Sequence, residues 1–268
     1  MVLYFHGGAF LTCGLNTHRR LVSRISYAAK QPVLNVGYRQ MPYEPIAESV
    51  ADGVEAFRWL LDQGYRAQDV TIAGDSAGGY LAFSVARAVM DAQLGRPAGV
   101  VALSPLLDVD STHKAAHRNA DRCQTFPLKA LQRFTEVSLR MDTRRGIDGK
   151  RVCPVNMPVD DLPPALIQIG SREILLADAE LMANRLVQAG VPCDLQVWDR
   201  QVHVFQAAAS WVPRGPARDR RGRRVRPRPR RARGRGHPSR DGRARRAGGR
   251  RPPGRGRGSL TGTSVPRR

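Results

Sequence analysis

The segment Gly74-Asp75-Ser76-Ala77-Gly78 places a serine where it could act as a nucleophile. The spacing Gly-x-Ser-x-Gly is a weak signal by itself. Here a short apolar run precedes it and a helix-like run follows it, and this strand–turn–helix context is typical of a nucleophile elbow. Glycines fit on both sides because a Cβ there would collide with the neighbouring strand and helix. We therefore predict that Ser76 is exposed to substrate with the Ala77 N–H facing the same space; an ordinary glycine-rich turn is the alternative.

A serine hydroxyl is a weak nucleophile until a base takes its proton, and histidine is the usual base. In a strand–turn–helix arrangement of this kind the chain order is serine, acid, histidine, which excludes the two histidines that precede Ser76. His203 follows the last predicted strand, at the carboxyl end where active sites of open α/β sheets lie. It is therefore the predicted base, and a solvent-exposed loop histidine is the alternative. The other histidines are His6, His18, His113, His117 and His237.

Two carboxylates compete for the acid that would orient this base. Glu173 is three residues past Gly170, inside the loop that follows the preceding strand. Asp178 falls in the first turn of the next predicted helix, where the helix dipole favours a carboxylate for structural reasons. We favour Glu173 and keep Asp178 as the alternative.

The stretch His6-Gly7-Gly8 follows the first predicted strand and supplies a second chemical feature. Acyl transfer requires hydrogen-bond donors aimed at the developing oxyanion. Glycines without side chains allow backbone N–H groups to approach a ligand closely. The N–H groups of Gly7, Gly8 and Ala77 are therefore the predicted oxyanion hole, and His6 is expected to steady the loop rather than to react.

Short apolar runs alternate with amphipathic ones along the chain, a pattern typical of a parallel sheet with crossover helices. This alternation predicts an α/β fold with helices on both faces of the sheet. Residues 106–162 are too long for a simple crossover and are expected to form a lid or cap around a helix at Pro127–Met141. The predicted strands are Val2–Phe5, Pro32–Val36, Val70–Ala73, Val100–Leu103, Ala165–Ile169 and Leu195–Trp198. The other predicted helices are Thr17–Ala29, Ile46–Gln63, Gly78–Ala92 and Ala177–Gln188.

The net charge of +21 belongs almost entirely to the last part of the chain. Residues 212–268 contain 22 Arg, no Lys and 2 Asp, whereas residues 1–211 carry a net charge of about +1. Arg, Gly, Pro and Ala make up 45 of these 57 residues, so the segment lacks the apolar side chains that a core requires and is expected to be disordered. Non-specific binding of nucleic acid through this tail is a rival function, weakened by the lack of interleaved aromatic residues.

The four cysteines are far apart and lack the spacing of a zinc site or a redox motif. Four reduced thiols in a cytoplasmic protein are the simplest interpretation. The chain shows neither a signal-peptide pattern nor a run of about 18 apolar residues, so no membrane span is predicted.

Taken together, the segments HGGAF, YRQMPYEP, GDSAGG and HVF resemble, in content and order, the hormone-sensitive-lipase-like bacterial esterases of the α/β-hydrolase fold. The resemblance covers roughly residues 1–211. It implies a serine carboxylesterase that acts on small to medium acyl esters through an acyl-enzyme and needs neither a metal nor an organic cofactor. It implies the roles of nucleophile for Ser76, base for His203 and oxyanion donors for Gly7 and Gly8, whereas Glu173 falls where the family most often has Asp.

Two departures from the family pattern shape a further expectation. Family members have capping helices and two strands before the His-Gly-Gly loop, and a helix after the catalytic histidine. We therefore expect a chain truncated at its N-terminus with an aberrant, frameshift-like tail. A catalytically inactive fragment is the alternative to an active esterase.

Overall fold

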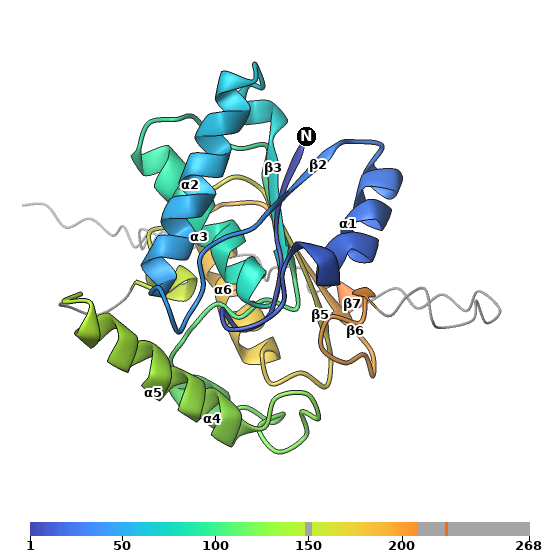
Figure 1. Ribbon diagram of the computed structural model, residues 1–268. Coiled ribbons are helices and arrows are strands. Elements are labelled where there is room, and N and C mark those ends of the chain that lie inside the picture. The colour runs from blue at the N-terminus through green and yellow to red at the C-terminus, as the bar shows by residue number, and fades with distance from the viewer. Residues whose placement is uncertain (148–151, 208–222, 225–268) are drawn as a thin grey trace, which may run out of the picture. The chain divides into compact units, whose positions relative to one another are not determined.

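The architecture is a single twisted sheet flanked by helices, seen in a computed structural model that describes residues 1–147, 152–207 and 223–224 (Figure 1). The sheet order is β2-β1-β3-β4-β5-β6-β7. The first six strands in the sequence are parallel, and β7 pairs antiparallel with β6. The predicted α/β class is confirmed. The strands are β1 (Val2–Phe5), β2 (Val33–Val36), β3 (Thr71–Asp75), β4 (Gly99–Leu103), β5 (Ala165–Gly170), β6 (Cys193–Trp198) and β7 (Arg223–Arg224).

The helices cover the two faces of this sheet unequally. Among the described elements α1 lies on one face, and α2, α3 and α6 lie on the other (Figure 1). Every predicted helix is present, with ends that shift by up to three residues. The helices are α1 (Leu15–Ala29), α2 (Ile46–Asp62), α3 (Ala77–Asp91), α4 (Thr112–Ala115), α5 (Leu128–Arg144) and α6 (Leu176–Gln188), with short 3₁₀ turns at Ala67–Asp69 and Pro154–Asn156.

Strand β1 shows how the sequence pattern becomes a two-sided core. Successive side chains of a strand point to opposite faces. Leu3 and Phe5 therefore enter the large cluster beneath α2, α3 and α6, whereas Val2 and Tyr4 pack with Leu21 of α1. All four β1 side chains are buried, which explains why this strand is an uninterrupted apolar run.

The segment predicted as a lid contains α4, α5 and the second 3₁₀ turn. One face of α5 is buried, with Leu131, Phe134 and Met141 repeating at helical spacing. The Phe134 ring stacks on Phe10 with the ring centroids 6.4 Å apart, which joins α5 to the loop after β1. This contact places part of the segment over the carboxyl end of the sheet, where a cap would act.

The Arg-rich stretch at 212–268 was expected to lack structure. Two of its residues, Arg223–Arg224, form β7 and pair with Val197 and Gln196 of β6. The edge of β6 offers unpaired backbone groups, which a neighbouring segment can satisfy. The rest of the stretch lies outside the described residues, as does the whole of a second compact unit, Pro229–Arg268. Within the described part of the chain, no helix combines the length and apolar character needed to cross a bilayer.

Candidate active site

The turn between β3 and α3 holds Ser76 in a strained backbone conformation. Ser76 has φ 53° and ψ −118°, a region that residues with side chains rarely adopt and that is common at functional sites. A Cβ at Gly74 would lie 2.2 Å from the Gly78 carbonyl oxygen, and one at Gly78 would lie 2.0 Å from that of Phe5. Both positions therefore require glycine. The structure has the strand–turn–helix geometry predicted for a nucleophile elbow.

Glu173 and His203 meet at the carboxyl ends of β5 and β6. His203 Nδ1 lies 2.7 Å from Glu173 Oε2, and the carboxylate is 1% exposed. The other carboxylate oxygen, Oε1, accepts hydrogen bonds from Ser104 Oγ at 2.7 Å and from the Gly170 N–H at 2.6 Å. With Oε1 occupied in this way, Oε2 is directed at the imidazole, an arrangement suited to orienting a base.

Ser104 makes polar contacts with Glu173 and Val204 that the sequence did not predict. It follows β4 directly, and its Oγ accepts the Val204 N–H at 3.0 Å while donating to Glu173. One residue earlier, the Leu103 carbonyl accepts the Ser76 N–H at 2.9 Å. Consecutive residues at the end of β4 thus join the Ser76 turn to the loops of Glu173 and His203. The only sequence signal was a polar residue immediately after a buried strand.

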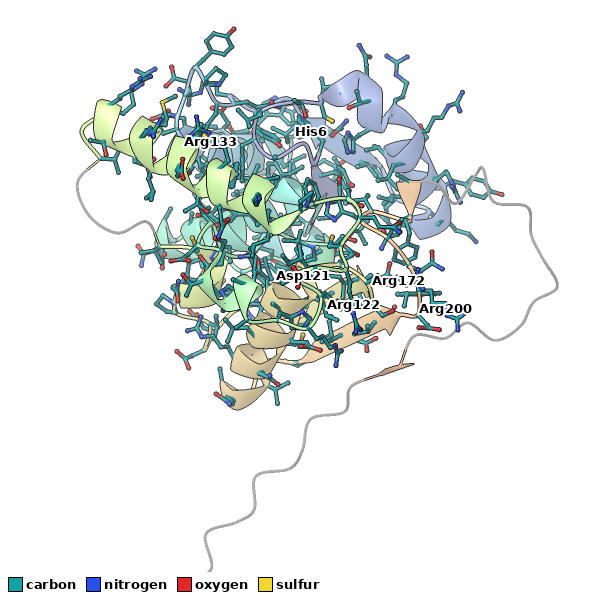
Figure 2. All side chains as sticks on the ribbon, turned by 90° about the horizontal axis from the view of Figure 1, so that it is seen from below. His6, Asp121, Arg122, Arg133, Arg172 and Arg200 are labelled. Atoms are coloured by element: carbon teal, nitrogen blue, oxygen red, sulfur yellow. The ribbon has the colours of Figure 1, made fainter. Side chains whose placement is uncertain are left out.

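Residues 106–162, predicted as a lid, make further contacts with the loops of Glu173 and His203. Asn119 Nδ2 donates to the Glu173 and Ser171 carbonyl oxygens, at 2.8 and 2.9 Å. The Phe126 ring packs edge-on against the His203 imidazole, with the centroids 4.6 Å apart. Figure 2 looks onto the carboxyl ends of the parallel strands, where Arg122 and Arg172 line a small opening together with Glu173 and His203.

Asp178, the alternative acid, belongs to a separate buried network. Its Oδ2 accepts the backbone N–H groups of Leu107 and Asp108, at 2.8 and 3.0 Å. Its Oδ1 lies 2.6 Å from His113 Nε2 and 2.9 Å from Lys114 Nζ. Asp178 therefore ties the start of residues 106–162 to α6, and its contacts are with His113 rather than with His203.

The loop after β1 corrects one prediction about the oxyanion hole. The Gly7 N–H donates to Asp75 Oδ1 at 3.1 Å, so this predicted donor already has an acceptor within the protein. Among the hydrogen bonds of residues 1–147 and 152–207, none uses the N–H of Gly8, Ala9 or Ala77. Ala9, at φ 54°, follows Gly8 in the same turn and was not among the predicted donors.

His6 lies beneath this loop and shapes its backbone. Its Nδ1 donates to the Gly7 carbonyl at 2.7 Å, while the Tyr38 hydroxyl donates to the His6 carbonyl at 2.7 Å. The Tyr38 ring also stacks on the His6 ring, with 4.4 Å between centroids. Burial lowers the pKa of His6, which favours the neutral imidazole. His117 contacts Glu180, and His237 lies outside the described residues.

Cysteine thiols are the other strong nucleophiles in the sequence. The four cysteines are free, and burial raises the pKa of Cys153 to about 11 and that of Cys193 to about 12, so both thiols stay protonated at neutral pH. Over the described ranges, no three His, Cys, Asp or Glu side chains gather as a metal-ligand set.

Comparison with known proteins places this geometry in a family. A family model described as the alpha/beta hydrolase fold matches residues 2–207. The chain belongs to the α/β-hydrolase family. This hydrolase is 42% identical over 215 residues to the esterase LipU of Mycobacterium tuberculosis, covering 79% of this chain and 72% of that protein. It is 38% identical to the carboxylesterase/phospholipase LipF of the same species, covering 80% of this chain and 58% of LipF.

Solved structures agree with the sequence relatives. An esterase from the bacterial hormone-sensitive lipase family superposes on this hydrolase with a TM-score of 0.74 at 35% identity, covering 80% of this chain and 71% of that one. An esterase/lipase from an uncultured bacterium gives a TM-score of 0.72 at 34% identity, with coverage of 79% and 70%. The resemblance to the hormone-sensitive-lipase-like bacterial esterases is confirmed.

Proposed function

We propose that Ser76, His203 and Glu173 form the catalytic triad with which this hydrolase cleaves small to medium acyl esters. The enzyme is a carboxylic ester hydrolase, as its relatives are. The observation that carries the residue assignment is the buried 2.7 Å contact between Glu173 and His203, at the same end of the sheet as the strained Ser76 turn. Glu173, not Asp178, is the proposed acid because Asp178 is fully used by other donors.

In the proposed mechanism, His203 Nε2 takes the proton of Ser76 Oγ as this oxygen attacks the carbonyl carbon of the ester. The π electrons of the carbonyl move to its oxygen, which becomes the oxyanion. When the C–O bond to the alcohol breaks, the imidazolium returns the proton to the leaving oxygen, and the acyl group stays on Ser76. Water then repeats the sequence and releases the carboxylic acid. Glu173 holds the imidazole orientation and stabilises its transient positive charge.

The proposed oxyanion donors are the N–H groups of Gly8, Ala9 and Ala77. Ala77 opens α3, so its N–H is among those without an intrahelical acceptor. Gly8 and Ala9 follow Gly7. A Cβ added at Gly7 would lie 3.1 Å from Ser76 Cβ, so the turn of Gly8 and Ala9 begins directly beside the proposed nucleophile. Donors held in place before the reaction stabilise the oxyanion without reorganisation.

Substitution of the nucleophile tests the proposal. Ser76→Ala should abolish hydrolysis of p-nitrophenyl butyrate, because no hydroxyl remains to form the acyl-enzyme, and a fluorophosphonate should label Ser76 alone in the unaltered chain. Ser23→Ala, an exposed serine of α1, is the matched control and should retain full activity and labelling. Hydrolysis that survives in Ser76→Ala, or labelling at another residue, would contradict the assignment.

Two further properties are proposed for the whole chain. The charge of +20 on residues 212–268 supports non-specific binding of nucleic acid by that stretch. Four free cysteines favour a reducing compartment, and we therefore propose a cytoplasmic location.

A further inference from the structure

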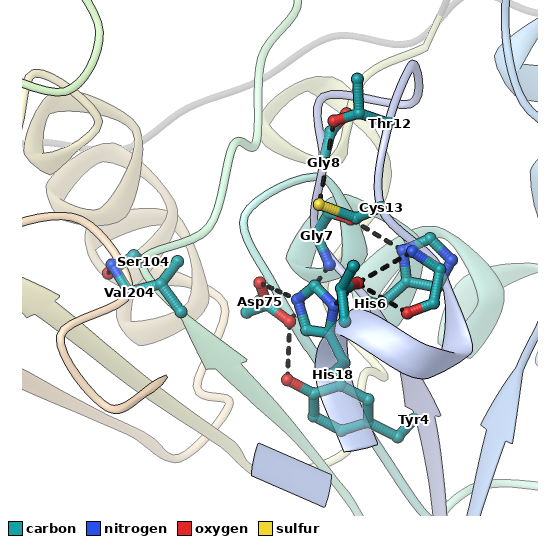
Figure 3. Close-up of polar contacts among 12 residues, drawn as sticks. Tyr4, His6, Gly7, Gly8, Thr12, Cys13, His18, Asp75, Ser104 and Val204 are labelled. Atoms are coloured by element: carbon teal, nitrogen blue, oxygen red, sulfur yellow. Dashed lines mark hydrogen bonds and ion pairs between the residues drawn. The ribbon is translucent and has the colours of Figure 1, made fainter. Parts of the chain in front are cut away.

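Asp75, the residue before the nucleophile, is a buried carboxylate that the proposed mechanism does not use. It is 2% exposed and has three donors around it (Figure 3). Its Oδ1 accepts the Tyr4 hydroxyl at 2.6 Å and the Gly7 N–H at 3.1 Å, and its Oδ2 lies 3.2 Å from His18 Nε2. Asp75 thus joins the nucleophile turn to β1, to the oxyanion loop (residues 6–9) and to α1.

The second nitrogen of His18, Nδ1, faces a hydroxyl that can accept a proton from the ring. His18 Nδ1 lies 2.9 Å from Thr17 Oγ1. This hydroxyl can donate its single proton either to the Gly14 carbonyl, 2.8 Å away, or to His18 Nδ1. Nε2 donates to the Asp75 carboxylate, and in the protonated ring Nδ1 donates to Thr17 Oγ1 while the proton of this hydroxyl bonds the Gly14 carbonyl. An imidazole that donates through both nitrogens carries a positive charge.

The titratable groups around His18 are compatible with this charge. Burial tends to lower the pKa of His18, but the hydrogen bond and the charge of Asp75 raise it above the usual histidine value. Burial, with the charge of Asp75, raises the pKa of Tyr4 well above that of a free tyrosine, so its hydroxyl keeps the proton that it donates. The His6 ring, 5.4 Å from His18, has a lowered pKa because of burial and the neighbouring charge of His18.

The position of the oxyanion loop depends on this cluster because the Gly7 backbone is packed against Asp75. A Cβ at Gly7 would lie 2.3 Å from Asp75 Oδ2, so the backbone presses directly on the carboxylate. The Gly7 N–H bond to Asp75 fixes the peptide that precedes the Gly8 and Ala9 donors. Movement of Asp75 would move these donors, and the stabilisation of an oxyanion is sensitive to their position.

We propose that protonated His18 is a positioning residue, which pairs with Asp75 and thereby holds the oxyanion loop in its catalytic position. The role deepens the proposed function and rests on it. Chain order excludes His18 as the base; its place beside Asp75 gives it a different task.

Kinetics of three variants of the full chain test this role. His18→Leu removes both the charge and the donor, and kcat for p-nitrophenyl butyrate should fall by about tenfold or more, part of the 10²–10³ that one oxyanion donor contributes. KM should change much less. His18→Gln keeps a neutral donor and should recover part of kcat. Arg19→Ala, an exposed neighbour on α1, is the matched control and should behave as the unaltered chain.

The pH profile gives a readout that a merely structural role would not move. Because the pKa of His18 is raised, the charged form persists above the usual histidine range and is lost as pH rises through the raised pKa. The unaltered chain should therefore lose activity on the alkaline side, and His18→Gln, which does not titrate, should lack that decline. An alkaline decline retained in His18→Gln would overturn the proposal, even if His18→Leu failed to fold.

An NMR titration of ¹⁵N-histidine-labelled protein, read at His18, provides a test independent of activity. His18 should titrate above the usual histidine value, and Asp75→Asn should lower its pKa. Titration at or below the usual value would refute the ion pair. If the unaltered chain is neither active nor labelled at Ser76, the proposed function fails; if it is active and His18→Leu matches Arg19→Ala, only the role of His18 fails.

Discussion

Glu173 and Asp178 are both buried carboxylates near the start of α6, but they have different hydrogen-bond partners and therefore different proposed roles. Glu173 keeps one oxygen for His203 because Ser104 and Gly170 occupy the other. Asp178 has no oxygen to spare, since two backbone N–H groups and the side chains of His113 and Lys114 take both. Burial of a carboxylate therefore does not by itself indicate catalysis; its partners do.

The two amide substitutions should separate these roles. Glu173→Gln should lower kcat by about 10³–10⁴-fold, because an amide cannot orient and stabilise the imidazolium, while the thermal midpoint changes little. Asp178→Asn should keep kcat within about tenfold and lower the thermal midpoint, because it leaves the buried Lys114 charge uncompensated. Steady-state kinetics and thermal unfolding of both variants are the measurements. The reverse ranking of kcat would make Asp178 the acid.

At the scale of elements, the β3–α3 turn depends on three backbones that approach without side chains between them. The carbonyl of Phe5 at the end of β1 lies against Gly78 in the first turn of α3, and the Gly78 carbonyl in turn lies against Gly74 of β3. The elbow is therefore a packing arrangement of β1, β3 and α3 together. The strained conformation of Ser76 persists because the packing of these neighbouring backbones allows the turn no other conformation.

Addition of one methyl group at this contact should damage the elbow. Gly78→Ala would place a Cβ 2.0 Å from the Phe5 carbonyl oxygen, which forces β1 and α3 apart at a cost of about 1–3 kcal/mol or more in the free energy of unfolding. We expect a lower thermal midpoint and a large loss of kcat. Gly37→Ala is the control, because the atoms nearest to its Cβ would be those of the Leu15 side chain, at an ordinary contact distance of 3.6 Å. Equal stability of the two variants would contradict this account.

At the scale of the whole molecule, the net charge differs sharply between two parts of the chain. Residues 1–211 are nearly neutral, whereas residues 212–268 carry +20. The triad and oxyanion residues proposed above all lie in the nearly neutral part. Catalysis and any binding through the basic stretch should therefore be separable.

Removal of residues 212–268 should leave the kcat for p-nitrophenyl butyrate unchanged or higher. The full chain should bind single-stranded RNA without sequence preference, and its affinity should fall by about 10³-fold or more between 50 and 200 mM salt, as expected when several phosphates are neutralised. Fluorescence anisotropy with a labelled oligonucleotide, run on both proteins, measures this. Loss of esterase activity on truncation would show that the removed stretch belongs to the catalytic fold.

Sequence alone predicted most of the elements and the turn that holds Ser76. Buried strands such as β1 are continuous apolar runs, and helices such as α5 repeat their apolar residues at helical spacing, so both follow from local pattern. The geometry around Ser76 was predictable because its signal, a glycine-flanked turn between strand and helix, is also local. α4 and β7 are too short to leave a periodic signal.

Tertiary structure alone decided which groups meet. The Gly7 N–H is taken by Asp75, 68 residues later, and Ser104 reaches Glu173 across 69 residues. Glu173 rather than Asp178 meets His203 because loops from β4, β5 and β6 end side by side, while α4 brings His113 and Lys114 to Asp178. Hydrogen bonds form over about 3 Å, and the paths of separate loops bring their partners that close. Local sequence specifies the elements, but only the packed sheet fixes those distances.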